Sequence, residues 1–111
     1  MNDKDITLFI IFLRFGPNRN QAGQWMAAHK QWIQDGITDG TFLMAGSLDK
    51  AQGGVVIAKG KDGDVIRARV AQDPFVLHDV VSAEVHGVAP SLMAEGLAAL
   101  LQRNQADRAM S

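Results

Sequence analysis

Two residues of this chain have side chains suited to proton transfer, His29 and Asp73. Apolar residues at Trp25, Trp32 and Ile33 stand three or four positions from His29, so on a helix this histidine lies on the face expected to be buried. An imidazole that pairs with a carboxylate through one nitrogen keeps its other nitrogen free to take or give a proton near neutral pH. Sequence spacing alone does not show whether the two residues meet.

Each of these residues also has a purely structural interpretation. A buried histidine is commonly hydrogen-bonded to a backbone carbonyl, and aspartate is common at helix ends because its side chain bonds the local backbone. A zinc site built from His29, His78 and His86 would be the alternative, but their spacing matches no known zinc signature. We therefore expect no metal site.

Motifs for nucleotide cofactors and for nucleophilic catalysis are missing. The glycines at 53–54 and 60–63 match neither the dinucleotide fingerprint nor a phosphate-binding loop, and there is no serine nucleophile elbow or HExxH arrangement. The absence of cysteine excludes disulfides, thiolate metal sites and a cysteine nucleophile. We expect an activity, if there is one, that needs no cofactor.

Composition limits the partners. The chain has 111 residues, which indicates one domain, and its 11 Lys and Arg against 12 Asp and Glu provide no basic excess for binding nucleic acid. The apolar run at 6–15 lacks a basic flank and a cleavage site, and it is shorter than the roughly 20 residues of a membrane span. We expect no nucleic-acid or membrane partner, and a cytoplasmic location, which suits a cysteine-free domain.

Strand-like and helix-like segments alternate along the chain. Residues 6–15 are almost continuously apolar, which predicts a central strand covered on both faces. Asn18 or Asn20 is placed to cap the helix that follows, and Pro74 ends the second helix. The expected order is a strand at 6–15, a helix to about 35, a hairpin of strands at 41–46 and 55–58, a helix at 65–72 and a strand at 80–88.

The last predicted strand alternates, and a C-terminal helix follows it. We expect one face of the strand to carry Val81, Ala83 and Val85 and the other to carry Ser82, Glu84 and His86. Pro90-Ser91 opens the last helix. The predicted domain covers residues 1–111, with its core at about 6–90, the C-terminal helix at about 91–104 and a tail at 105–111.

This order predicts an α+β fold of the ferredoxin-like (βαββαβ) type, an antiparallel sheet with two helices on one face. The other sheet face needs a cover from the C-terminal helix, from a second subunit, or from both. We therefore expect a homodimer. A pocket for a small-molecule ligand would lie between sheet and helices or where two subunits meet.

Several short motifs occur in a fixed order along residues 8–88. They are His29 on the first helix, Ile37 followed by Gly40, Phe42 to Gly46, the pair Gly53-Gly54 before a strand, and Asp73-Pro74-Phe75 after the second helix. The ordered set resembles the YciI-like (YCII-related) family. That resemblance implies a dimeric α+β barrel of ferredoxin-like subunits, with a pocket around a paired histidine and aspartate, here His29 and Asp73.

The chain departs from this pattern at two positions. Ser47 follows Gly46 where the family commonly has proline, and His78 stands where glycine is frequent. Ser47 is either a pocket hydroxyl or a turn residue, since serine suits both. We expect His78 on the surface, and Asp49 as a solvated loop residue, the alternative for Asp49 being a second carboxylate near the site.

One branch of the family is similar to dehydrochlorinases that act on chlorinated hydroxyhydroquinones. We therefore predict a lyase or isomerase for a small hydroxylated, aromatic or cyclic substrate, with His29 as general base or acid oriented by Asp73. The alternatives are a non-catalytic module that binds a small molecule and a dimeric scaffold with no ligand-sized cavity.

Four further residues belong to the predicted pocket. The Ser47 hydroxyl and the Gly46 backbone would bind a substrate oxygen, while Phe75 and Trp25 would form walls. Both aromatic residues have a structural alternative as core or interface residues, because such side chains bury a large area.

Overall fold

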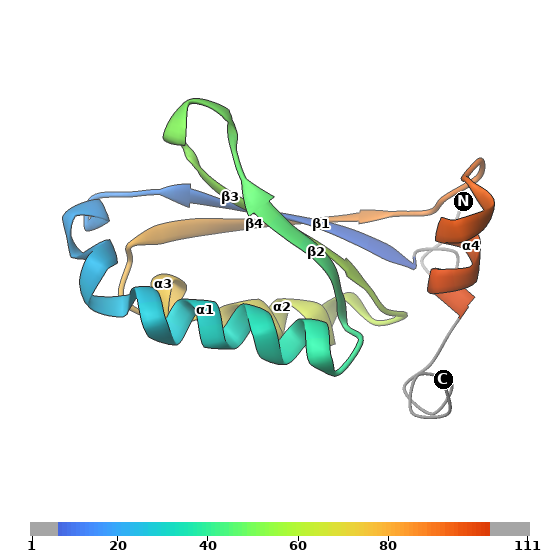
Figure 1. The fold of residues 1–111 in the computed structure, drawn as a ribbon, viewed down its shortest axis with the longest axis horizontal. Coiled ribbons are helices and arrows are strands. Elements are labelled where there is room, and N and C mark those ends of the chain that lie inside the picture. Colours follow the sequence, from blue (N-terminus) through green and yellow to red (C-terminus); the bar gives the residue numbers. More distant parts are fainter. Residues whose placement is uncertain (1–6, 103–111) are drawn as a thin grey trace.

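The computed structural model describes residues 7–102, which form a four-stranded sheet with helices α1, α2 and α3 on one face (Figure 1). Two 3₁₀ turns, Arg19–Gln21 and Asp49–Ala51, lie outside these elements. The elements are β1 Leu8–Phe15, α1 Ala22–Thr38, β2 Phe42–Ser47, β3 Gly53–Lys59, α2 Gly63–Ala71, α3 Pro74–Leu77, β4 Val81–Val88 and α4 Glu95–Gln102.

The strand order in the sheet is β2-β3-β1-β4, and every neighbouring pair is antiparallel. Ile11 of β1 lies opposite Val56 of β3 on one side and Val85 of β4 on the other. The predicted β2–β3 hairpin and the ferredoxin-like α+β fold are both confirmed. The two central strands, β1 and β3, both contribute residues that face the space between the sheet and the helices.

Alternation along β1 separates the two sheet faces. Phe9, Ile11 and Leu13 are buried toward the helices, where Trp32 of α1 and Ile66 of α2 pack in the same core. The register of β4 confirms its predicted alternation, since its positions 81, 83 and 85 pair with core-facing positions of β1. Burial of this apolar face is the main stabilising contribution to such a fold.

Helix α1 differs from its predicted bounds at both ends. Neither predicted cap is used, because the 3₁₀ turn precedes the helix and the Asn18 side chain donates instead to the backbone oxygen of His78. The helix also continues through Gly36. A Cβ atom there would lie 2.1 Å from the ring of Phe42, so this glycine permits close packing against β2 and does not end the helix.

The second helix ends before Pro74 as predicted, but a short helix, α3, follows at once. The Asp73 side chain accepts a hydrogen bond from the backbone of Phe75, and proline occupies the first helical turn. Four residues are too few to show helical periodicity, which explains why this element was not predicted.

No element formed by residues 7–102 covers the second face of the sheet. Ile10, Phe12 and Ile57 lie on it and are only half-buried, so the prediction of a β1 strand covered on both faces is not met within one chain. The C-terminal helix starts at Glu95, later than predicted, and lies beyond the end of the sheet (Figure 1). Residue 6 and the predicted helix end and tail at 103–111 lie outside the described residues.

Helix α4 makes little contact with the rest of the chain. The Lys59 ammonium donates to the backbone oxygen of Leu100, and no residue of α4 is buried. Leu92, just before the helix, is 94% exposed. Across residues 7–102, no helix has the length and apolar character needed to span a membrane.

Candidate functional site

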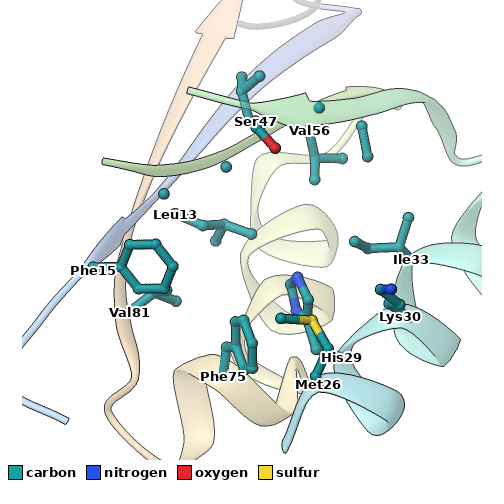
Figure 2. A pocket seen from close by; sticks show the side chains of 15 residues that line it. Leu13, Phe15, Met26, His29, Lys30, Ile33, Ser47, Val56, Phe75 and Val81 are labelled. Carbon is teal, nitrogen blue, oxygen red and sulfur yellow. The ribbon is translucent and has the colours of Figure 1, made fainter. Parts of the chain in front are cut away.

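A cavity of about 360 Å³ lies between the sheet and helices α1 and α3 (Figure 2). Helix α1 contributes Met26, His29, Lys30 and Ile33, and α3 contributes Phe75. The sheet side is formed by strand side chains and by glycines at the facing ends of β2 and β3. The sheet-side lining residues are Leu13, Phe15, Ala45, Gly46, Ser47, Gly53, Gly54, Val55, Val56 and Val81.

His29 and Asp73 are hydrogen-bonded at the edge of this cavity. His29 Nδ1 lies 2.7 Å from Asp73 Oδ1, the Asp73 side chain is fully buried, and the His29 side chain is 13% exposed. The same Oδ1 atom accepts the backbone N–H of Phe75 at 3.0 Å. Because a carboxylate oxygen can only accept, we assign the proton of the neutral ring to Nδ1, which donates to Asp73. Nε2 is then the nitrogen with a free lone pair.

The imidazole ring of His29 is positioned by an aromatic stacking contact as well as by its hydrogen bond to Asp73. The rings of His29 and Phe75 are stacked with centroids 3.9 Å apart and planes 5° apart. Asp73 and Phe75 are separated only by Pro74, whose ring restricts the backbone. One short segment, Asp73-Pro74-Phe75, therefore fixes both the tautomer and the plane of the ring.

The second carboxylate oxygen of Asp73 has no hydrogen-bond partner among residues 7–102. Oδ2 is buried and accepts no hydrogen bond from the described residues, while Oδ1 accepts two. A carboxylate in hydrogen-bond contact with an imidazole stabilises a positive charge on that ring. Proton uptake at Nε2 would create such a charge, so the pair is suited to general acid–base chemistry.

The cavity is lined by three of the residues predicted for the pocket, Gly46, Ser47 and Phe75. Figure 2 shows the Ser47 hydroxyl directed into the cavity from the sheet side. Trp25 does not line it, which corrects its predicted role as a wall. Its indole is stacked on the ring of His78, with centroids 3.6 Å apart. On α1 the side chain of Trp25 points toward the end of α3, one helical turn away from His29.

The remaining candidates lie away from the cavity. His78 is exposed and stacks on Trp25, Asp49 is exposed in a 3₁₀ turn, and His86 is exposed on the open face of β4. Among residues 7–102, no three His, Asp or Glu side chains form a group that could hold a metal ion.

Sequence reasoning missed Met26, Lys30 and Ile33. Met26 and Ile33 stand three positions before and four after His29, the spacing that shares one helix face, so this signal was present in the sequence. Lys30 gave no such signal, because it follows His29 directly and an exposed lysine on a helix is ordinary.

Backbone forms much of the sheet side of the cavity. Gly53 has φ +139°, and a Cβ atom there would lie 2.0 Å from the backbone oxygen of Leu13. At Gly54 a Cβ atom would lie 3.2 Å from the backbone oxygen of Gly46. Only glycine fits at position 53, where β3 lies against the backbone of β1.

Two carboxyl groups with a lowered pKa lie outside the cavity. Partial burial opposes ionisation of Asp39, but hydrogen bonds from the Thr41 backbone and the Arg69 guanidinium outweigh it and lower the pKa. The pKa of Glu84 is lowered chiefly by the hydrogen bond from His86 and next by that from Arg14. The first group links α1 to α2, and the second lies on the open sheet face.

Comparison with known proteins identifies structural relatives only. No family model matches the chain, and no curated protein matches its sequence. The structure is similar to TftG, a 5-chloro-2-hydroxyhydroquinone dehydrochlorinase from Burkholderia phenoliruptrix AC1100 in complex with 2,5-dihydroxybenzoquinone. The TM-score is 0.60 at 18% identity, over 71% of this chain and 90% of that chain.

Two further relatives are longer proteins. A transcriptional regulator from Neisseria meningitidis in complex with L-Met has a TM-score of 0.53 at 15% identity, over 79% of this chain and 53% of its own. MtbAldR has a TM-score of 0.55 at 11% identity, over 81% of this chain and 57% of its own. This chain thus corresponds to just over half of each. At these identities the likeness shows the fold alone, a ferredoxin-like α+β fold.

Proposed function

We propose that this protein is a cofactor-independent enzyme of the lyase or isomerase type, acting on a small hydroxylated aromatic or cyclic substrate. One observation carries the proposal. His29 donates through Nδ1 to the buried Asp73, and no described residue hydrogen-bonds Nε2 at the edge of a ligand-sized cavity. A purely structural histidine would have both nitrogens occupied.

In this proposal His29 Nε2 takes a proton from a substrate hydroxyl, and Asp73 stabilises the imidazolium that forms. The Ser47 hydroxyl and the Gly46 backbone bind a second substrate oxygen from the sheet side. In a dehydrochlorination, one hydroxyl proton moves to His29 Nε2 and is returned to the ring carbon that bears chlorine, which becomes tetrahedral. A second hydroxyl then loses its proton to the same nitrogen, and chloride leaves with the electron pair of the C–Cl bond. A chlorinated hydroxyhydroquinone thereby becomes a hydroxyquinone without an external oxidant.

The same proposal includes the YciI-like family, a homodimer and a cytoplasmic location. The open sheet face carries half-buried apolar residues, including Ile10, Phe12 and Ile57, and Leu92 and Leu100 near the C-terminal helix are exposed. Apolar surface of this extent favours a second copy of the chain as its cover. Sedimentation equilibrium should give twice the chain mass, and a monomer at micromolar concentration would contradict the dimer.

The function is tested with 5-chloro-2-hydroxyhydroquinone under anaerobic conditions, with chloride release and quinone absorbance as readouts. We expect release above the protein-free rate, with 2,5-dihydroxybenzoquinone as a competitor. Binding of that quinone at the cavity without chloride release from a panel of halogenated and hydroxylated rings would favour the non-catalytic binding module. Absence of any binding in the cavity would favour the scaffold and overturn the proposal.

A further inference from the structure

The charges around the cavity are unbalanced. Among its lining residues, His29 and Lys30 have titratable side chains, and no lining residue is acidic. Asp73 does not line the cavity and is bonded to His29. A ligand in this cavity therefore meets a lysine cation with no carboxylate on the walls to neutralise it.

Lys30 is not used elsewhere in the described part of the chain. Its ammonium has no ion pair or hydrogen bond with residues 7–102, and it is exposed to solvent. The residues three and four positions away on α1 are Met26, Ala27, Ile33 and Gln34, so no acidic partner stands at helical spacing. Figure 2 shows Lys30 between His29 and Ile33, on the α1 side of the cavity.

The other walls favour a ring. Phe15, Phe75, Leu13 and Ile33 present apolar surface, while the polar groups on the walls are few: His29, Ser47 and the glycine backbone. One ammonium beside apolar walls suits a single carboxylate. The arginine fork that commonly binds a phosphate does not occur among the lining residues of this cavity.

From this arrangement we infer that the site selects an aromatic or cyclic carboxylate, with Lys30 as the specificity-determining residue that binds the carboxylate at the cavity mouth. The inference rests on the proposed function, because it places the substrate ring between Phe75 and the sheet with a hydroxyl at His29. Lys30 then orients the ring, so that the hydroxyl and not the carboxylate reaches Nε2.

The test uses a matched pair of probes, 2,5-dihydroxybenzoate and its neutral methyl ester. Binding is measured by NMR shifts of cavity residues in the wild-type protein, in Lys30→Gln and in Lys61→Gln. Lys61 is an exposed lysine between β3 and α2 that does not line this cavity, which makes it the control.

We expect wild-type protein and Lys61→Gln to bind the carboxylate about two- to fivefold more tightly than the ester, the size expected of one exposed charge pair. Lys30→Gln should lose this preference while its affinity for the ester is unchanged, and added salt should reduce the preference in the wild type.

Equal binding of the two probes by the wild type, or an undiminished preference in Lys30→Gln, would overturn the inference and leave the proposed function intact. If neither probe shifts the signals of cavity residues, the ring substrate itself is wrong, and the proposed function fails together with the inference.

Discussion

Residues 7–102 contain two histidine–carboxylate pairs, and the two pairs differ in burial and in what surrounds them. His29 and Asp73 are 2.7 Å apart and mostly or fully buried, and His29 lines a cavity. His86 and Glu84 are 3.2 Å apart on the open sheet face, with about half of each side chain exposed. The pairs also use opposite ring nitrogens, Nδ1 in His29 and Nε2 in His86.

The difference shows that residue types do not define a proton-transfer site. Glu84 is shared with the Arg14 guanidinium at 2.9 Å and faces water, so its charge is screened and divided between two partners. Within residues 7–102, Asp73 has His29 and the backbone N–H of Phe75 as its only side-chain hydrogen-bond partners, and its side chain is fully buried. Burial and an adjacent cavity, and not the pairing itself, are what distinguish His29 as the candidate for proton transfer.

The largest expected effect is on turnover. His29→Gln should lower the rate of chloride release about 10²–10⁴-fold, because the general base is lost. The matched His86→Gln variant should stay within about twofold of the wild type, a general estimate for a residue remote from the reacting groups. Equal losses in the two variants would show that the cavity pair has no special role.

The next effect is on stability. Asp73→Ala removes the cap of α3 and the partner of His29 from a buried position, which should lower the free energy of unfolding by about 2–4 kcal/mol. Glu84→Ala should leave it nearly unchanged. Urea unfolding followed by tryptophan fluorescence measures both. Asp73→Asn, which keeps an acceptor for Phe75, should recover part of the loss, and no recovery would contradict the capping account.

The tautomers should differ without any mutation. At a pH where both rings are neutral, His29 should carry its proton on Nδ1 and His86 should favour Nε2. Imidazole ¹⁵N shifts report this directly, and Asp73→Asn should weaken the preference in His29. Finding the same dominant tautomer in both rings would contradict the assigned hydrogen-bond network.

The smallest expected effect is the pH dependence due to Glu84. Its pKa in the folded chain is lowered from 4.5, so its contribution to stability is present above that value and is lost as the pH falls through the folded pKa. Glu84→Gln should therefore reduce the loss of thermal stability on acidification below about pH 4.5. Melting temperatures measured between pH 3 and 6 test this. If the melting temperature of Glu84→Gln falls with pH as steeply as that of the wild type, other carboxylates cause the loss of stability.

Sequence patterns predicted the fold well because it depends on long apolar segments. The β1, β3 and β4 strands and the hairpin follow from β-branched runs and glycine turns, and their pairing order follows from the element order. The ends of α1 were wrong because tertiary contacts decided them: Asn18 bonds to His78, and Gly36 packs on Phe42.

The site was predictable only in part. Motifs resembling the YciI-like family placed His29 beside Asp73, whereas periodicity could not, since the contact depends on how α3 folds back onto α1. Trp25 was misplaced because helical spacing alone does not distinguish the cavity side of α1 from the side that meets His78. Lys30 was missed for a related reason, since exposed charge carries no periodic signal.

The glycine-rich sheet side of the cavity limits how its size can change. Gly53 cannot accept any side chain, and Gly54 has little space before it meets the backbone of Gly46. Side chains are not readily added at these two positions, whereas Met26 and Ile33 on α1 can be exchanged without moving a strand. The size of a bound ligand would therefore be adjusted more readily through α1, while the glycine backbone of the sheet stays constant.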